Sequence, residues 1–343
     1  MLTEDEQQRH LLLVSRTFAL TIPLIKGQLA DAIANAYLIC RIADTMEDDP
    51  KLAPEQKVRW LRRFAYELEH GFADDEKLLQ LQDAAAAQLK DSAVPAEYAL
   101  CCELLKVLQR TRSYPVAVQR IIGHGAAVLS AGMAEHLSGL SVQSLDDVDA
   151  YCYSVAGVVG ELLAKLFALY DPQCPQAKIF TLAVSFGEGL QLTNILKDRD
   201  TDAARAVSFL PAVQTGSTQE QLIAHYCALA QGHLQQATDF TCMLSGRKLY
   251  GVRLFCLLNI AMAVLTLKRI ERHPLGTQQE LKISRRTVKM TLLLCTLCAR
   301  FNFSARLLLR LLRGNSPCTL RDAAELSHKV SKWEQPLNLL PQL

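Results

Sequence analysis

The chain has 343 residues and a mass of 38.1 kDa, which is long enough for one large hydrophobic core or two smaller ones. Half of the residues are hydrophobic, 21% are charged, and the formal net charge is +2. Because the net charge is small and no basic run is interleaved with aromatic residues, we expect no nucleic-acid partner.

The N-terminus predicts a protein that is not secreted. Its first ten residues, MLTEDEQQRH, are charged and polar, unlike a secretory signal. The longest uncharged apolar stretch near the C-terminus, 290–299, is shorter than the roughly 20 residues that a membrane-spanning helix needs. We therefore expect a cytoplasmic protein without a transmembrane helix.

Eleven cysteines are present, without the regular spacing of a disulfide framework. Cys295 and Cys298 form a CxxC pair inside an apolar helical pattern, with no second Cys or His pair. Metal or redox use stays open, but small buried side chains in a reducing cytosol are the favoured interpretation.

Helical periodicity dominates the chain, since apolar residues recur three and four positions apart. The pattern predicts helices over 29–49, 58–70, 98–111, 116–137, 180–198, 219–244, 252–271 and 286–312. Breaks are predicted where Gly, Pro, Asp or Ser cluster, at 49–50, 113–115, 171–172, 214–217 and 314–317. We predict one all-α domain over 1–313 and a C-terminal tail over 314–343 whose order the sequence does not decide.

Two of these helices carry polar stripes of similar design. In the first, steps of four, three and four align Tyr37, Arg41, Asp44 and Asp48 on one face. In the second, nearly the same spacing aligns Gln191, Asn194, Asp198 and Asp202. The residues around both stripes are mostly apolar.

Carboxylates four residues apart on a helix repel one another, and burying them without compensation is costly. Magnesium would neutralise them, because it prefers oxygen ligands and typically binds one or two carboxylates together with substrate phosphates. Arg41 and Lys197 lie beside the stripes and suit the same phosphates. The alternative is that each stripe is an ordinary solvated face of an amphipathic helix.

From about residue 15 to residue 294 the sequence resembles the squalene/phytoene synthase family. Four segments carry the resemblance. They are Ser15-Arg16-Thr17-Phe18, Asp44-Thr-Met-Glu-Asp48, Tyr151-Cys-Tyr-Ser-Val-Ala-Gly157-Val-Val-Gly160, and Gln191-Leu-Thr-Asn194-Ile-Leu-Lys-Asp198-Arg-Asp-Thr-Asp202 followed by Phe209-Leu-Pro211.

The resemblance implies an isoprenoid-synthase-type helical bundle around a central apolar cavity, with the two acidic helices facing each other. It implies a Mg²⁺-dependent prenyltransferase whose catalytic residues are Tyr151, Asp44, Asp48, Asp198 and Asp202. The implied magnesium ligands are Asp44, Asp48, Asn194, Asp198 and Asp202. The implied substrate-binding residues are Ser15, Arg16, Phe18, Arg41, Gln191 and Lys197. Tyr151 would act near the developing carbocation, in proton transfer.

The sequence departs from the family pattern at three positions. Thr201 replaces a frequent Glu, Lys197 a frequent Arg, and Val207 a usually basic residue. The last change puts the usual contact of that loop with diphosphate in doubt. The glycines of the central motif, Gly157 and Gly160, allow either helix packing or close approach of substrate.

The last third resembles the squalene-forming branch of the family. The segment 252–267 resembles its long apolar helix, and Lys282-Ile-Ser-Arg285-Arg286 resembles a basic stretch associated with NADPH. Asn259, Lys282, Arg285 and Arg286 are the implied cofactor-binding residues, although a solvated helix start would explain the three cations nearly as well. No GxGxxG motif is present, so a nicotinamide site would be unconventional.

The implied reaction joins two farnesyl diphosphates head to head through presqualene diphosphate and reduces the product to squalene with NADPH. Dehydrosqualene or phytoene synthesis without hydride transfer is the main alternative, and the YCYS variant of the central motif leans towards it. A class I terpene cyclase and a catalytically inactive scaffold protein are further alternatives. The sequence does not predict the oligomeric state.

The segment 300–313, RFNFSARLLLRLLR, predicts a basic amphipathic helix. Arg306, Arg310 and Arg313 share one face, whereas Leu307, Leu308, Leu311 and Leu312 cover another. Such a helix could lie on an anionic membrane, giving peripheral association. A core helix with a solvated basic edge is the alternative.

Overall fold

The computed structural model describes residues 1–15, 17–139, 142–204, 207–213, 215–337 and 339, and no strand occurs in these ranges. The chain divides into two compact units: Met1–Ser141 with Lys332–Leu343, and Val142–Ser331. The domain bounds predicted from the sequence, 1–313 and 314–343, stay a prediction.

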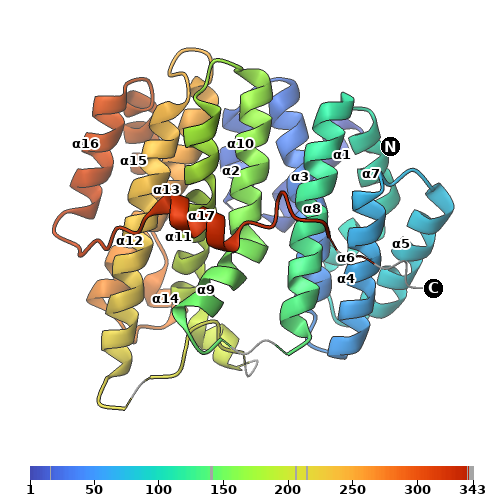
Figure 1. Ribbon diagram of the computed structural model, residues 1–343, viewed down its shortest axis with the longest axis horizontal. Helices are drawn as coiled ribbons and strands as arrows, with labels where there is room; N and C mark the ends of the chain where they lie inside the picture. Colours follow the sequence, from blue (N-terminus) through green and yellow to red (C-terminus); the bar gives the residue numbers. More distant parts are fainter. Residues whose placement is uncertain (16, 140–141, 205–206, 214, 338, 340–343) are drawn as a thin grey trace. The chain divides into compact units, whose positions relative to one another are not determined.

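The first unit is built on α3, α4 and α8, with α3 and α4 both packed on α8 (Figure 1, blue to teal). α3 also contacts α1, α6 and α7. The elements are α1 (Glu4–Val14), α2 (Phe18–Thr21), the 3₁₀ helix η1 (Ile22–Leu24), α3 (Gln28–Asp48), α4 (Pro54–Glu69), α5 (Asp75–Leu89), α6 (Pro95–Cys101), α7 (Leu104–Arg112) and α8 (Val116–Leu137).

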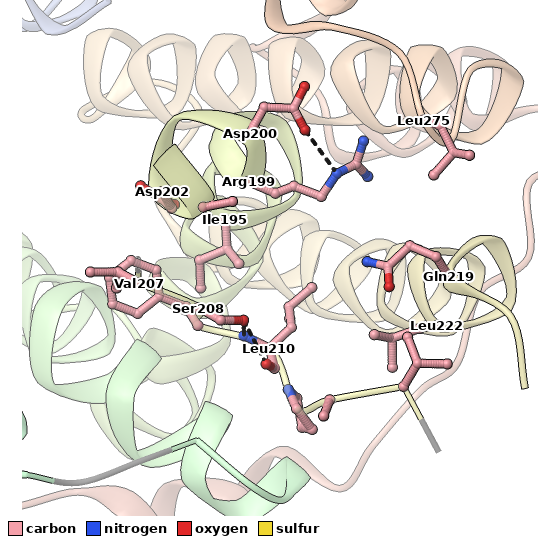
Figure 2. Close-up of a pocket in the computed structure, with 15 residues that line it drawn as sticks. Ile195, Arg199, Asp200, Asp202, Val207, Ser208, Leu210, Gln219, Leu222 and Leu275 are labelled. Atoms are coloured by element: carbon pink, nitrogen blue, oxygen red, sulfur yellow. Dashed lines mark hydrogen bonds and ion pairs between the residues drawn. The ribbon is translucent and has the colours of Figure 1, made fainter. Parts of the chain in front are cut away.

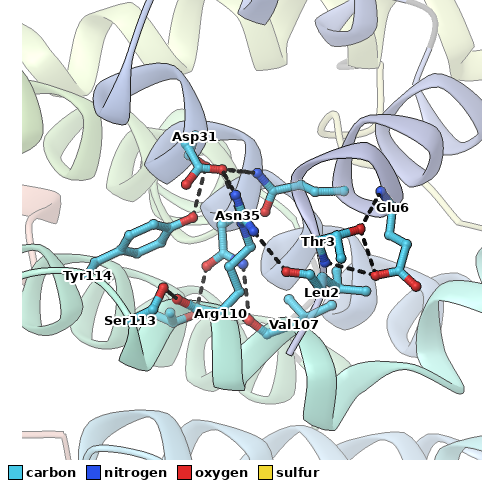
Figure 3. Close-up of polar contacts among 11 residues, drawn as sticks. Leu2, Thr3, Glu6, Asp31, Asn35, Val107, Arg110, Ser113 and Tyr114 are labelled. Atoms are coloured by element: carbon cyan, nitrogen blue, oxygen red, sulfur yellow. Dashed lines mark hydrogen bonds and ion pairs between the residues drawn. The ribbon is translucent and has the colours of Figure 1, made fainter.

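Buried and partly buried polar contacts fix the N-terminal half of α3 (Figure 3). The Arg110 guanidinium donates to Asp31 Oδ1 at 2.6 Å and to the Leu2 carbonyl at 2.8 Å. Asn35 donates to the Val107 carbonyl at 3.0 Å. Because unmade hydrogen bonds of buried groups are costly, this network holds α1 and α7 in register on α3, whose other half carries the first acidic stripe.

The second unit is organised around the 29-residue helix α11, which contacts α10, α12, α13 and α17. Its elements are α9 (Leu145–Cys152), the π-helix η2 (Tyr153–Gly157), α10 (Val158–Tyr170), α11 (Gln176–Ala204), α12 (Gln219–Met243), α13 (Tyr250–Arg272), α14 (Gln278–Leu281), α15 (Arg285–Cys298), α16 (Asn302–Arg313) and α17 (Ala323–Val330). Figure 1 shows them from green to red.

Six of the eight helices predicted from periodicity are confirmed as α3, α4, α8, α11, α12 and α13. The predicted breaks at Asp49, Ser113, Asp171 and Gly314 coincide with helix C-caps. The helix predicted over 98–111 is wrong as a single element, because α6 ends at Cys101 and α7 begins at Leu104. At this corner the Glu103 carboxylate contacts His10 Nε2 at 2.8 Å, which ties the turn to α1.

The helix predicted over 286–312 is also wrong as a single element, because it divides into α15 and α16. Arg253, 1% exposed, donates from Nε to the Ala299 carbonyl at 2.6 Å and from Nη1 to Asn302 Oδ1 at 2.7 Å. A buried guanidinium needs such partners, and the free carbonyls of a broken helix supply them. The apolar pattern continues through the corner, so periodicity alone did not reveal it.

The segment after Gly314 contains α17, which packs on α11. Asp322 caps this helix by accepting from the backbone N–H groups of Ala324 and Glu325. Part of the predicted tail is therefore helical and belongs to the second unit.

Three helical segments are long and apolar enough to cross a membrane by length and composition: Leu145–Tyr170, Gln176–Ala204 and Tyr250–Arg272. Between 67% and 78% of the most apolar window of each is buried inside the protein, as expected of core helices in a large helical fold. The predictions that no helix could span a membrane and that the protein is cytoplasmic therefore remain unconfirmed.

All eleven cysteines are free thiols, and seven are buried. Burial raises the pKa of Cys295 to about 12, whereas Cys298 is half-buried. A thiol that stays protonated at neutral pH is a weak nucleophile and metal ligand.

Candidate active site

The C-terminal half of α3 carries the first predicted stripe. Arg41 and Asp44 are half-buried and Asp48 is exposed, while most residues between them are buried. The stripe therefore lies where the core of the first unit meets solvent, which suits a site that must receive a charged ligand.

The predicted substrate-binding residues Ser15 and Phe18 lie against this stripe through Tyr37. Ser15 Oγ accepts from the Phe18 backbone N–H at 3.0 Å, and the rings of Phe18 and Tyr37 have centroids 5.1 Å apart. Burial raises the pKa of Tyr37, an effect that a hydrogen bond with Ser15 partly offsets. Arg16 lies outside the described residues.

Negative charge exceeds positive charge at this stripe. Arg41 pairs with the Glu97 carboxylate of α6 and lies 3.7 Å from Asp44 Oδ2. Loss of solvation raises the pKa of Asp44 to about 7, although 34% of its side chain is exposed; Arg41 opposes this shift, and Asp48 and Glu97 add to it. Arg41 thus lies between two carboxylates, and Asp48 adds a third negative charge near Asp44, an arrangement that favours binding of a cation.

The second stripe lies on α11. Lys197 Nζ lies 3.0 Å from Asp198 Oδ2 and donates to Asn194 Oδ1 at 3.3 Å. Gln278 of α14 donates to the other oxygen, Asp198 Oδ1, at 2.6 Å. Gln191 is half-buried and Asn194 is exposed. These contacts orient amide and carboxylate oxygens one helical turn apart.

Asp202, the last member of the stripe, is 7% exposed and lies beside a pocket of about 450 Å³ (Figure 2). The walls come from the last turns of α11, the loop 207–213, the start of α12 and Leu275. The Val207 backbone N–H donates to the Asp202 carbonyl at 3.0 Å, which ties the loop to the helix end. Among the described residues that line this pocket, Arg199 is the basic one, and it lies 3.8 Å from Asp200 Oδ1.

The central motif places Tyr151 against the same loop. Tyr151 is 6% exposed, and its ring stacks on Phe209 with centroids 4.3 Å apart. The π-helix η2 follows directly, and Tyr153 donates to Glu161 Oε2 at 2.8 Å. π-helical turns inside α-helices occur frequently at functional sites. The turn therefore supports a positioning role for this segment.

Gly160 of the central motif serves helix packing. A Cβ atom on Gly160 would lie 2.0 Å from the Ala183 carbonyl oxygen of α11, and one on Gly187 would lie 2.0 Å from the Ala156 carbonyl oxygen. The backbones of η2, α10 and α11 are thus in direct contact. The surroundings of Gly160 therefore require close helix packing, rather than close approach of substrate.

We expect Gly160→Ala to destabilise the protein by about 1–3 kcal/mol, because its methyl group would displace backbone atoms of α11. Urea denaturation followed by circular dichroism would measure the effect. At an uncrowded helix position the same change would stabilise the protein by roughly 1 kcal/mol. A stabilising result would therefore contradict the backbone contact.

No group of three or more His, Cys, Asp or Glu side chains within the described ranges is close enough to hold a metal alone. Each stripe instead presents one or two carboxylates in a net negative or amide-rich setting. This donor set fits magnesium, which prefers oxygen, keeps several waters and completes its shell with substrate phosphates. Asp44, Asp48, Asn194, Asp198 and Asp202 stay predicted ligands.

The predicted cofactor residues fall into two places. Lys282, Arg285 and Arg286 are exposed around the start of α15. Asn259 is 4% exposed and donates to the Phe255 carbonyl within α13. The Lys282 carbonyl contacts Arg269 of α13. Asn259 lies on the same helix, about 15 Å from Arg269 along its axis at a rise of roughly 1.5 Å per residue. Asn259 therefore lies apart from the three cations.

Three residues contact predicted site residues but were not predicted as site residues themselves: Glu97, Gln278 and Phe209. Glu97 and Gln278 lie on the short helices α6 and α14, outside the motifs, and only the folded chain brings them to Arg41 and Asp198. Phe209 follows the second acidic motif, which was the one available signal.

A sequence profile of the squalene/phytoene synthase family matches residues 12–287. The chain belongs to this family. Its C-terminal segment, which includes most of α15 and all of α16 and α17, extends beyond the matched residues.

The chain is similar to squalene synthases from Schizosaccharomyces pombe, at 29% identity over 80% of this chain and 61% of the relative, and from Rattus norvegicus, at 30% identity over 74% and 60%. It thus spans about three fifths of the length of these curated relatives.

Solved structures confirm the fold. A complex of TcSQS with the ligand BPH1237 superposes with a TM-score of 0.73 at 22% identity, covering 94% of this chain and 95% of that one. A ligand complex of a dehydrosqualene synthase gives 0.60 at 18% identity, covering 84% and 93%. The fold is the isoprenoid-synthase-type all-α fold predicted from the sequence; its central cavity stays a prediction.

Proposed function

We propose that the protein joins two molecules of farnesyl diphosphate head to head and reduces the product to squalene with NADPH. The observation that carries the proposal is the α3 stripe, where Arg41 faces an excess of carboxylates beside Ser15 and Phe18. Such a site would bind magnesium and diphosphate together, which one charge type alone would not achieve. The similarity to squalene synthases supports the choice within the family.

Each stripe carries groups that would bind diphosphate. At the first stripe, Arg41 of α3 and the hydroxyl of Ser15, the C-cap of α1, are polar groups at the edge of the core, and Arg16 is the further predicted contact. On α11, Gln191 and Lys197 would bind in the same way. Arg41 forms an ion pair with Glu97, and Lys197 forms one with Asp198. Substrate phosphate would therefore compete with these carboxylates for the two cations.

Magnesium, when bound by the stripe carboxylates and Asn194, would neutralise the diphosphate and make it a leaving group. The C1–O bond of one farnesyl diphosphate breaks and its electron pair leaves with the diphosphate. C1 then bonds to the C2–C3 double bond of the second molecule, and loss of one proton gives presqualene diphosphate.

Tyr151 would act beside this carbocation. Its low exposure and its stacking on Phe209 keep water from its ring, and an electron-rich ring face stabilises a nearby cation. We assign it the proton transfer that the first step requires. Presqualene diphosphate then ionises and rearranges.

NADPH would supply the hydride that ends the second step. Lys282, Arg285 and Arg286 fit the 2′-phosphate, because Arg285 and Arg286 lie in the first turn of α15, where the helix dipole favours an anion over a cation. Asn259 does not fit the same group, since it is buried and already bonded within α13.

Dehydrosqualene or phytoene synthesis is the second candidate, supported by the structural similarity to a dehydrosqualene synthase at the level of fold. It needs no hydride donor. An inactive scaffold protein is a third candidate, against which the retained aspartates of both stripes argue.

Incubation with farnesyl diphosphate and Mg²⁺, with and without NADPH, tests the proposal. We expect squalene with NADPH and accumulation of presqualene diphosphate without it, identified by mass spectrometry. Dehydrosqualene in both reactions would contradict the hydride step and leave the basic cluster structural. Absence of turnover with farnesyl and geranylgeranyl diphosphates would contradict the enzymatic proposal.

A further inference from the structure

The outer surface of α15 and α16 is unusually apolar. Seven of the twenty large apolar side chains that are exposed in the described chain lie within residues 290–311. We call them the α15–α16 apolar face: Met290, Leu293, Leu297, Phe301, Phe303, Leu307 and Leu311. Phe303 is 77% exposed and Leu297 68% exposed. The two helices contact each other and pack on α13 (Figure 1).

This surface differs from the one predicted from the sequence. Ala305, Leu308 and Leu309 of α16 are buried, so the apolar residues divide between a core face and an outer face. Arg306 binds Asp239 of α12 at 2.9 Å, and Arg313 binds Gln235. Two of the three predicted membrane-facing arginines are therefore engaged by α12.

Residues 281–321 contain nine Lys and Arg but no Asp or Glu. The rest of the chain has 28 Lys and Arg against 35 Asp and Glu, so it is negative overall. Among these cations, Lys289, Arg300 and Arg310 are exposed beside the apolar face. Arg310 forms no ion pair with any described residue, and with Arg306 and Arg313 it lines a hollow of about 460 Å³.

We propose that the α15–α16 apolar face docks on an anionic lipid bilayer. The apolar side chains would enter the boundary between headgroups and acyl chains, and Lys289, Arg300 and Arg310 would bind lipid phosphates. Charge selects this occupant over a second copy of the chain. The exposed cations Lys289, Arg300 and Arg310 would repel their counterparts on that copy, and the neighbouring Asp239 carboxylate is already paired with Arg306.

The test is co-sedimentation of the full chain with phosphatidylcholine vesicles, with and without phosphatidylserine. We expect binding to the anionic vesicles that weakens as salt rises. The combined variant Leu297→Ser, Phe303→Ser, Leu307→Ser should lower the partition coefficient at least about tenfold, since each exposed apolar side chain contributes to insertion. A matched control, Leu79→Ser with Val116→Ser, alters exposed apolar residues of the first unit and should leave binding unchanged.

Fluorescence of a Phe303→Trp variant gives a second measurement that does not depend on lost binding. The native tryptophans, Trp60 and Trp333, are at most 9% exposed, so a blue shift on adding anionic vesicles would report residue 303. Absence of vesicle binding, equal binding by the triple variant, or self-association that the triple variant abolishes would each overturn the proposal. None of these results depends on catalytic activity.

Discussion

Asp44→Asn and Asp198→Asn are each expected to reduce prenyl transfer by about a hundredfold or more. A metal ion contributes several kcal/mol of charge stabilisation, and each 1.36 kcal/mol is about tenfold in rate. The amide keeps the shape of the carboxylate but removes the charge that binds magnesium. Diphosphate release at saturating Mg²⁺ and farnesyl diphosphate would measure the loss.

Stability separates this effect from misfolding. Loss of solvation raises the pKa of Asp44, and Asp48 and Glu97 add to this shift against the opposing charge of Arg41, so removing the Asp44 charge relieves a net cost of folding at neutral pH. The Asp44→Asn protein should therefore unfold at the same or a higher temperature than the unmodified protein. Asp83→Asn, at an exposed position on α5, provides the control and should leave both activity and melting temperature unchanged. Near-normal activity of both stripe variants would contradict the magnesium assignment.

The stripes could be predicted from the sequence because helical spacing alone places residues four, three and four apart on one face. Their partners could not be predicted in this way. Arg41 meets Glu97 only because α6 packs on α3, and Asp198 meets Gln278 only because α14 packs on α11. Those contacts depend on tertiary packing over long sequence separations.

The same limit explains the two wrong helices. Periodicity reports which residues are apolar, and it continued through the corners at 102–103 and 299–301. The second corner is stabilised by Arg253, a buried cation of α13 that bonds the Ala299 carbonyl at the end of α15. Nothing in the apolar pattern of 252–267 indicated that Arg253 would contact the end of another helix. In α16 leucines occur on both sides of the helix, so the pattern could not indicate which side faces the core.

Arg321→Gln is expected to destabilise the protein by about 3–5 kcal/mol, because it would leave a buried carboxylate without its partner. Arg321 precedes α17 and binds Asp149 of α9 with both terminal nitrogens, at 2.6 and 2.7 Å. Asp149 is 2% exposed. Burial raises the pKa of the nearby Glu188 carboxyl, and the negative charge of Asp149 raises it further. Urea denaturation would show the loss as a lower midpoint.

Lys329→Gln is the matched control for this prediction. Lys329 of α17 pairs with Asp146 of α9, but both side chains are exposed, and such pairs contribute about 0–1 kcal/mol. Adding Asp149→Asn to Arg321→Gln should recover part of the stability, since the orphaned charge is then removed. If Arg321→Gln proved as mild as Lys329→Gln, the C-terminal segment would not be fastened through this pair. A large difference would show that residues beyond the family match hold α9, and with it Tyr151 two residues further on.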